Sequence, residues 1–281
     1  MSDAGESVKS KAAYLLGHSE HEIQRLKTQA RLIDPITRRF FAEAGIAPGM
    51  RVLDVGSGAG DVAFLAADLV GAGGEVVGID RVAGAIDAAR ERASVRTMPN
   101  VTFRVGDPGD LTFERPFDAV IGRYVLQFQK SPDAMLRRVS GFLKPDGLVA
   151  FHEIDWSGLA SFPPAPTFDR CCAWGLQTLR LHGTEARVGS KLHTSFVKAG
   201  LSAPSIRVEA MAGGGTRAAD VMRIMADLAV TLVPEMERLG VSSAREVGID
   251  GLFDRMQREV LANESFLVGH LQVGAWSRIP A

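Results

Sequence analysis

The chain alternates short apolar runs with longer stretches in which apolar residues recur every three or four positions. The short runs predict β-strands, and they lie near residues 51–55, 75–79, 101–106, 117–122 and 147–153. The longer stretches predict helices between several of these strands, near residues 61–71, 82–94 and 132–143. Regular alternation of strand and helix predicts a largely parallel sheet that is buried on both faces.

Helices are also predicted ahead of the first strand. Residues 14–30 contain long-chain helix formers with few breaks, and Pro35 begins a second helix that ends at Gly45. We therefore predict an N-terminal helical lid over residues 1–45, followed by a sheet-forming core over residues 46–155.

The pattern changes after the fifth predicted strand. A proline-rich connection leads to helices near 168–181 and 189–199, and then to a strand near 205–211. Residues 156–216 are therefore predicted to form connecting cap helices and a return to the sheet. Such additions lie over the carboxyl ends of the strands, where ligands bind in α/β sheets.

Three consecutive glycines at 213–215 open an insertion. Two more helices are predicted in it, near 220–239 and 245–263, and Pro234 interrupts the first. We predict a helical cap insertion over residues 217–264.

The last apolar stretch, residues 265–279, predicts a final strand at an antiparallel edge of the sheet, so that residues 265–281 return to the core. Large apolar side chains from the cap either line a cavity over the sheet or simply pack the cap. They are Trp156, Phe162, Trp174, Met211, Met222, Met225 and Met256.

The first predicted strand runs into three alternating glycines, Gly56, Gly58 and Gly60, with Ser57 between the first two. Glycine lets the backbone turn sharply and lets a ligand approach it closely. Asp80 follows the next predicted strand, where its carboxylate can accept hydrogen bonds from both hydroxyls of a ribose. The pattern indicates a nucleoside ligand.

The spacing of the glycines narrows the choice of nucleoside. The dinucleotide fingerprint is Gly-x-Gly-x-x-Gly, whereas this loop has Gly-x-Gly-x-Gly. Asp54 lies two residues before Gly56, and its carboxylate repels a pyrophosphate but suits a ligand that carries an ammonium and a sulfonium. S-adenosylmethionine carries both groups.

With these motifs the chain resembles the class I S-adenosylmethionine-dependent methyltransferases, specifically the small-molecule branch that includes ubiquinone/menaquinone-type and natural-product enzymes. Three further segments carry the resemblance, at residues 101–108, 117–127 and 143–155. The resemblance implies a Rossmann-like, doubly wound α/β fold with a mostly parallel seven-stranded sheet and an antiparallel last strand. It also implies S-adenosylmethionine as the cofactor and a small-molecule acceptor as the partner.

Further cofactor contacts are predicted along the strand ends. The resemblance implies that Asp107 meets the adenine amino group, and we expect Arg81 to pack along the adenine edge. Arg123, or Gln29 on the lid, would engage the methionine carboxylate, although a lone arginine is also commonly a solvated surface charge. The predicted cofactor-binding residues are Asp54, Gly56, Ser57, Gly58, Gly60, Asp80, Arg81, Asp107, Pro108, Arg123, Tyr124 and Gln29.

Methyl transfer from a sulfonium requires mainly that nucleophile, methyl group and sulfur be held in line, and a general base is optional. His152 lies near the end of the fifth predicted strand and is the candidate base if it faces the cleft. The alternative is a strand histidine that is hydrogen-bonded within the core, on the face opposite Glu153. Tyr14 and His18 on the lid are the other candidate catalytic residues, because the resemblance implies a lid that folds over cofactor and acceptor.

Composition restricts the remaining choices. The chain has 32 Lys and Arg against 33 Asp and Glu, so it lacks the basic field that holds nucleic acid. Its N-terminus is polar and no apolar run is long enough for a membrane span, so we expect a cytoplasmic protein. The two cysteines, Cys171 and Cys172, are adjacent and predict reduced thiols, with no metal site. A homodimer remains an open alternative.

Other functions share parts of this pattern. A nicotinamide-dependent oxidoreductase has the same order of strand, glycine loop and acidic residue, but the glycine spacing and Asp54 disfavour it. A non-catalytic cofactor-binding protein is a second alternative, which the apolar cap disfavours. Methylation of protein or RNA is a third, which the balanced charge disfavours. The preferred prediction is methylation of a small, largely apolar acceptor on oxygen first, then on carbon or nitrogen.

Overall fold

The computed structural model describes residues 20–280, with side chains from Ala30 onward. Two predicted catalytic residues, Tyr14 and His18, lie outside the described residues, as does the side chain of Gln29. Their assignments stay predictions.

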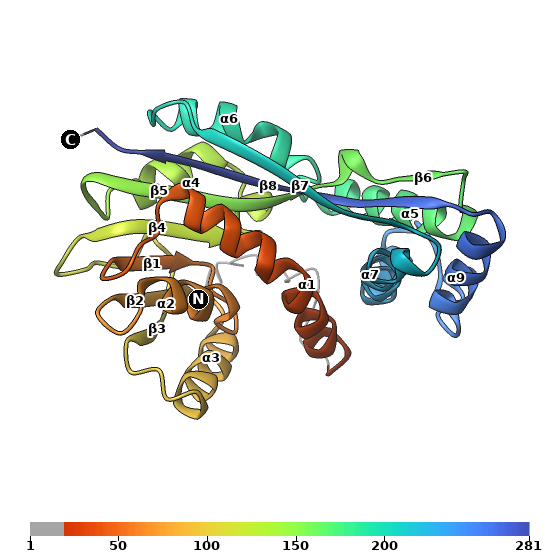
Figure 1. Ribbon diagram of the computed structural model, residues 1–281, viewed down its shortest axis with the longest axis horizontal. Coiled ribbons are helices and arrows are strands. Elements are labelled where there is room, and N and C mark those ends of the chain that lie inside the picture. Colours follow the sequence, from red (N-terminus) through yellow and green to blue (C-terminus); the bar gives the residue numbers. More distant parts are fainter. Residues whose placement is uncertain (1–19, 281) are drawn as a thin grey trace, which may run out of the picture.

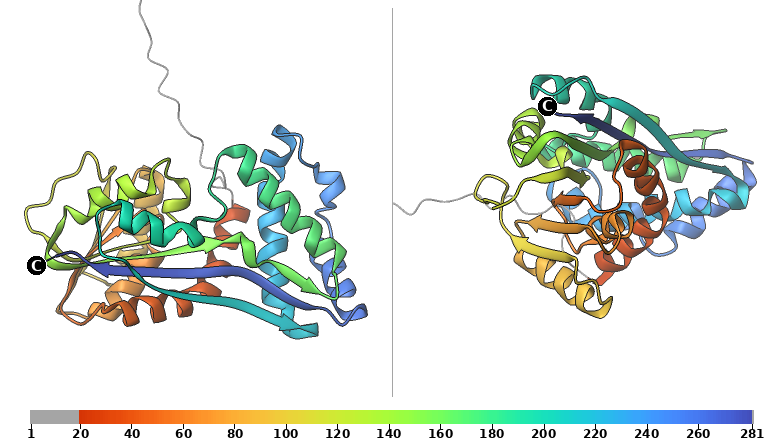
Figure 2. Two further views of the ribbon diagram at one scale, coloured as in Figure 1. Left: turned by 90° about the horizontal axis from the view of Figure 1, so that it is seen from above. Right: turned by 60° about the vertical axis from the view of Figure 1, so that its left-hand side comes forward.

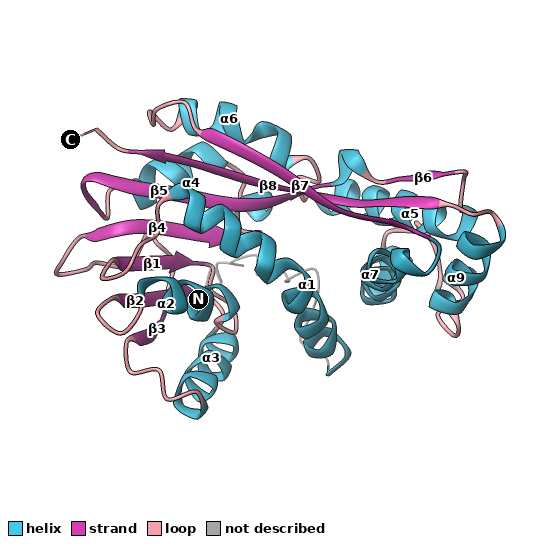
Figure 3. Ribbon diagram, viewed as in Figure 1, coloured by secondary structure: helices cyan, strands magenta, loops and turns pink. Residues whose placement is uncertain are grey.

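One sheet of eight strands runs through the molecule in the order β3-β2-β1-β4-β5-β8, and β6 and β7 both pair with β8 (Figure 3). The strands are β1 (Arg51–Val55), β2 (Glu75–Asp80), β3 (Val101–Val105), β4 (Phe117–Arg123), β5 (Leu143–Asp155), β6 (Ala160–Phe162), β7 (Ser205–Gly214) and β8 (Phe266–Arg278). The first five are parallel, whereas β8 is antiparallel to β5, β6 and β7. The mostly parallel sheet and the antiparallel last strand are therefore confirmed.

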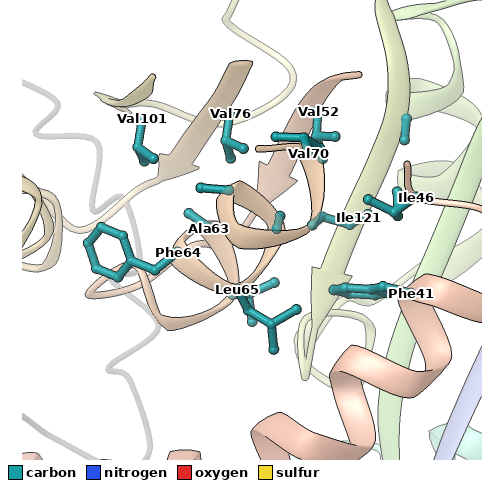
Figure 4. Packing of buried hydrophobic residues seen from close by; sticks show 14 of the residues in the cluster. Phe41, Ile46, Val52, Ala63, Phe64, Leu65, Val70, Val76, Val101 and Ile121 are labelled. Carbon is teal, nitrogen blue, oxygen red and sulfur yellow. The ribbon is translucent and has the colours of Figure 1, made fainter. Parts of the chain in front are cut away.

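Helices cover both faces of the parallel part (Figure 2). One face carries α1 (Glu20–Ala44), α2 (Asp61–Val70) and α3 (Ala83–Val95), and the other carries α4 (Pro132–Ser140) and α6 (Val188–Lys198). Strand alternation sends neighbouring side chains into separate cores, so that Val52 packs with Val70 of α2, as Figure 4 shows, while Leu53 packs with Leu136 of α4. This two-sided burial fixes the register of β1, whose carboxyl end leads into the glycine loop.

A helical cap packs against the part of β7 and β8 that continues beyond the parallel strands (Figure 1). It consists of α5 (Pro166–His182), α7 (Ala219–Arg238), α8 (Ala244–Val247) and α9 (Leu252–Ala262). Met222, Met225 and Met256 are buried in its own apolar core, so these three side chains pack the cap, while Phe162 is 62% exposed. No helix among residues 20–280 is long and apolar enough to cross a membrane.

The lid differs from its prediction. Instead of a break at Pro35, one helix, α1, runs from Glu20 to Ala44 with Pro35 inside it. Its buried positions, Ile33, Ile36 and Phe40, follow one helical face through the proline. Burial of this face stabilises the helix by more than the loss of one backbone hydrogen bond at Pro35 costs. The prediction of a break considered only the proline and not this burial.

The cap insertion and the end of the sheet also differ. The predicted helix over 245–263 is divided into α8 and α9, because Gly248 and Gly251 adopt φ values of 59° and 69°, which end one helix and precede the next. The predicted break at Pro234 is absent, since α7 is continuous.

The last strand is not at the edge, because β8 lies between β5 and β7, and β7 forms the edge. The short strand β6 raises the strand number from the predicted seven to eight. Three residues give too short an apolar run to predict a strand.

Candidate active site

The loop after β1 is held by left-handed glycines. Gly56, Gly58 and Gly60 have φ values of 68°, 52° and 91°, a region that other residues rarely adopt. A Cβ on Gly56 would lie 2.7 Å from a methyl carbon of Val125, and one on Gly60 would lie 2.8 Å from the ring of Phe103. A Cβ on Gly58 would have no atom within 4 Å. Close packing explains Gly56 and Gly60, and Gly58 leaves open space above the loop.

Asp80 at the end of β2 braces this loop. Its carboxylate accepts hydrogen bonds from the backbone amides of Gly58, at 3.0 Å, and Val82, at 2.8 Å. Each oxygen keeps a second lone pair, and the side chain is half-buried at the sheet edge. The predicted neighbour Arg81 is exposed.

The end of β3 is tied to the end of β2. The amide of Gly106 donates to the carbonyl of Asp80 at 2.9 Å, and the carboxylate of Asp107 accepts from the amide of Gly109 at 2.8 Å. Pro108 is buried beside it. These bonds place Asp107 next to Asp80, as the predicted adenine and ribose contacts require.

Asp54 is the most unusual carboxylate in this region. It is fully buried, and neither of its oxygens makes a hydrogen bond of normal geometry with a described residue. Burial raises its pKa well above the ordinary value, while the positive charge of Arg123 opposes the shift. The hydroxyl of Ser57 in the loop is also buried without a partner among the described residues. Orphaned groups of this kind are rare in native proteins and indicate an absent ligand or water.

Arg123 at the end of β4 is engaged by the lid helix. Its guanidinium donates to the carboxylate of Asp34 at 2.7 Å and to the hydroxyl of Thr37 at 3.0 Å, and its side chain is only 9% exposed. The solvated-charge alternative for Arg123 is therefore wrong. The pair with Asp34 joins α1 to the strand ends and brings a positive charge close to Asp54.

His152 on β5 faces α1 and is fully buried. Its Nδ1 atom lies 3.0 Å from the hydroxyl of Thr37, and its Nε2 atom lies 2.9 Å from Oε1 of Gln272 on β8. Tyr124 donates its hydroxyl proton to the same Gln272 oxygen. Burial, assisted by Arg123, lowers the pKa of His152 to about 3. Both ring nitrogens are occupied, which favours a histidine bonded within the core, and the role of base stays a prediction.

Glu153 points to the opposite face, as strand alternation requires. One of its oxygens accepts hydrogen bonds from the amides of Val125 and Leu126, at 2.9 and 2.8 Å, and so anchors the turn η1 (Leu126–Phe128). Burial raises its pKa to about 8. Glu153 thus fixes the segment after β4, in which Val125 packs against Gly56 of the glycine loop and Phe128 lines the cavity under the cap.

A cavity of about 70 Å³ opens beside this turn, between α1, the strand ends and the cap. Its walls include Tyr124, Trp156 and Met211, so two of the predicted apolar side chains do line a cavity. His270 and Gln272 of β8 line it as well. His270 is only 4% exposed, and its Nε2 atom has no hydrogen-bond partner among the described residues.

Sequence reasoning did not identify Asp34, Thr37, His270 or Gln272. Their positions depend on how α1 and β8 pack against β4 and β5, which no local motif records. One signal was available, because His270 and Gln272 are two residues apart in a strand and must therefore share a face. Among the described residues, no group of three or more His, Cys, Asp or Glu is placed to hold a metal ion.

Comparison with known proteins gives a consistent picture. A family model described as a methyltransferase domain matches residues 46–190. Nocamycin O-methyltransferase of Saccharothrix syringae is 33% identical over 155 residues, which cover 55% of this chain and 51% of that protein. Aklanonic acid methyltransferase of Streptomyces sp. (strain C5) is 37% identical over 118 residues, 42% of this chain and 54% of that protein. The matches thus span about half the length of these curated relatives.

Solved structures share the fold. Phosphoethanolamine N-methyltransferase 2 of Haemonchus contortus, bound to S-adenosylhomocysteine, has a TM-score of 0.52 at 22% identity and covers 84% of this chain and 50% of that one. The [4+2]-cyclase SpnF has a TM-score of 0.53 at 22% identity and covers 88% of this chain and 82% of that one. Because these two neighbours differ in reaction, the shared fold does not by itself determine the chemistry.

Proposed function

Because the chain belongs to the methyltransferase domain family, we propose that it transfers a methyl group from S-adenosylmethionine to a small, largely apolar organic acceptor. We expect the methyl group to be transferred to an oxygen atom of the acceptor, with carbon or nitrogen as the less favoured alternatives. The proposal concerns the whole protein, of which the family model covers residues 46–190.

The observation that carries the proposal is the orphaned carboxylate of Asp54. A buried carboxylate without partners is costly, and a cationic ligand that reaches it restores both a charge partner and hydrogen-bond donors. The ligand must lie along the glycine loop, because Asp54 is the last but one residue of β1. S-adenosylmethionine meets both conditions, since it combines a nucleoside with an ammonium and a sulfonium.

The neighbouring residues fit the nucleoside part of the cofactor. Asp80 would accept the ribose hydroxyls through its remaining lone pairs, and the open space over Gly58 leaves room for the ribose. Asp107 would accept the adenine amino group, and Arg81 would lie along the adenine edge. Asp34 competes with the methionine carboxylate for Arg123, so we propose that Arg123 acts through its long-range positive charge as well as by direct contact.

The cofactor, when bound, supplies a methyl group on a positively charged sulfur, so that the carbon–sulfur bond breaks as the bond to the acceptor atom forms. The protein contributes orientation and exclusion of water. Tyr124 is held by Gln272, and Gln272 by His152, so this network fixes the wall between cofactor loop and cavity. A hydroxyl acceptor must also lose its proton; His152 is the predicted base, and His18 and Tyr14 are the other predicted catalytic residues.

Two features support a small apolar acceptor over protein or RNA. The cavity beside Tyr124 has a volume of only about 70 Å³, and its lining residues carry no full charge. The curated relatives include enzymes named for nocamycin, aklanonic acid and 2-phytyl-1,4-naphthoquinone, which are all small organic molecules. The nicotinamide alternative is disfavoured, because a pyrophosphate offers the buried carboxyl of Asp54 neither a positive charge nor a hydrogen-bond donor.

Transfer of an isotopically labelled methyl group tests the proposal. The purified protein is incubated with labelled S-adenosylmethionine and a host extract that has been separated into small molecules, protein and RNA. We expect label in a small-molecule product, and we expect Asp54→Asn to abolish it while the exposed-helix control Asp87→Asn retains it. Label found only in protein or RNA would contradict the acceptor assignment.

A further inference from the structure

The cavity beside Tyr124 has one polar group that no neighbour satisfies. His270 is 4% exposed, and its Nε2 atom, although buried, has no hydrogen-bond partner among the described residues. Gln272, the other polar residue of β8 in this wall, is different, because its Oε1 atom accepts from both Tyr124 and His152. The unsatisfied polar group of the wall is thus on His270, and buried polar groups without partners call for a ligand.

The surroundings determine which ligand fits His270. Its ring meets the edge of Trp156 at a centroid distance of 4.5 Å, and Leu228, Leu232 and Met211 complete an apolar wall. None of the lining residues is Asp, Glu, Lys or Arg. Burial lowers the pKa of His270 to about 3, so its imidazole is neutral at physiological pH. A charged ligand would be desolvated here without a counter-ion, so the site suits an uncharged one.

Position along β8 places His270 away from the cofactor loop. Gln272 is bonded to Tyr124, which follows β4 beside the loop, and His270 lies two residues nearer the cap on the same face of the strand. A molecule that fills the cavity therefore presents one end to the loop and the other to His270. The group bound by His270 is remote from the transferred methyl group.

We propose that His270 is the specificity-determining residue of the acceptor pocket, and that its Nε2 atom hydrogen-bonds a hydroxyl group on an uncharged aromatic ring. This inference rests on the proposed function, since it names the substrate class of the same site. An apolar cavity of roughly 150 Å³ holds benzene, so the wall must move outward to admit a ring. The flexible side chain of Met211 allows such a movement.

Phenol and toluene form a matched pair of probes, because they differ only in a hydroxyl against a methyl group of similar size. Each is titrated into the protein in the presence of S-adenosylhomocysteine, and histidine side-chain ¹⁵N resonances report binding. We expect phenol, but not toluene, to shift the Nε2 resonance of His270. We expect the ratio of phenol to toluene affinity to fall about tenfold in His270→Phe, which removes the hydrogen bond but keeps a ring.

Two further variants separate recognition from folding. His270→Gln retains a donor and an acceptor and should recover part of the preference for phenol. Leu228→Val removes only apolar contact and should weaken both probes together, leaving their ratio unchanged. The inference is overturned if neither probe binds, if phenol leaves the His270 resonance in place, or if His270→Phe keeps the wild-type ratio.

These binding measurements do not depend on turnover. If labelled methyl transfer to small molecules occurs but the two probes are not distinguished, the inference about His270 fails and the proposed function stands. If the probes are distinguished but no methyl transfer occurs with any extract, the pocket assignment stands and the proposed function fails.

Discussion

The two halves of the cleft are built in different ways. The half along the glycine loop is made of backbone conformation and of carboxylates at strand ends, such as Asp80, which accepts from the amides of Gly58 in the loop and of Val82 directly after β2. The half under the cap is made of side chains from α1, η1, β5, α5, β7, α7 and β8, together with Trp156. The first depends on a few neighbouring residues and the second on tertiary packing. This difference explains how one fold can keep its cofactor while it changes its acceptor.

The largest expected effect tests the loop half. Asp54→Asn removes the negative charge that the cofactor is proposed to meet, so affinity for S-adenosylmethionine should fall on the order of 100-fold, measured by calorimetry. The same change should raise the melting temperature near neutral pH, because burial has raised the pKa of Asp54 and an ionised carboxylate there disfavours folding. Equal affinity in variant and wild type would remove Asp54 from the site.

The next effect tests the network between the two halves. His152→Ala leaves a cavity and removes one hydrogen bond each from Thr37 and Gln272, so the free energy of unfolding should fall by about 2 to 3 kcal/mol. If His152 only stabilises the wall of the cavity, turnover should fall in proportion to the loss of stability, and Gln272→Leu should lower both turnover and stability in the same way. A large fall in kcat with unchanged stability and unchanged cofactor affinity would instead support His152 as the base.

A pH experiment addresses the turn that links the halves. Burial raises the pKa of Glu153 from 4.5 to about 8, so the native state holds a proton that the unfolded chain has lost. The contribution of protonated Glu153 to the free energy of unfolding is complete below pH 4.5 and is lost as pH rises through 8. Between pH 5 and pH 8 the free energy of unfolding, measured in urea, should therefore fall less in Glu153→Gln than in wild type, by on the order of 2 kcal/mol. Parallel pH profiles for the two proteins would count against a buried, protonated Glu153.

The smallest expected effect is at the ribose contact. Asp80→Ala should weaken cofactor binding about tenfold, because the ribose bonds and the brace on Gly58 are lost. Asp87→Ala, on the exposed face of α3, provides the matched control and should leave affinity unchanged. An Asp80→Ala variant that binds as well as this control would undo the ribose assignment.

The glycine loop and the alternation of strands and helices along the core could be predicted because their signals are local. Gly56 to Gly60 follow an apolar run directly, and Asp80 follows the next one. Proline at position 35 was misleading, since the buried face of α1 continues through it. Gly248 and Gly251 did carry a turn signal, which the helical periodicity around them obscured.

The acceptor half could not be predicted from such signals. His270 reaches the cavity only because β8 lies between β5 and β7, which brings its ring against Trp156. The sequence indicates that a cap exists and that it is apolar, but not which of its side chains face the cavity. Met211 on β7 lines the cavity and Met225 on α7 packs the cap, although the sequence predicts both as apolar side chains of the cap.

A crystal structure of the protein with S-adenosylhomocysteine and phenol would test the two-part cleft most directly. The account predicts the ribose on Asp80, the amino group of the ligand within hydrogen-bonding distance of Asp54, and the sulfur facing phenol in the cavity beside Tyr124. A sulfur that points away from this cavity, or phenol bound elsewhere, would contradict it.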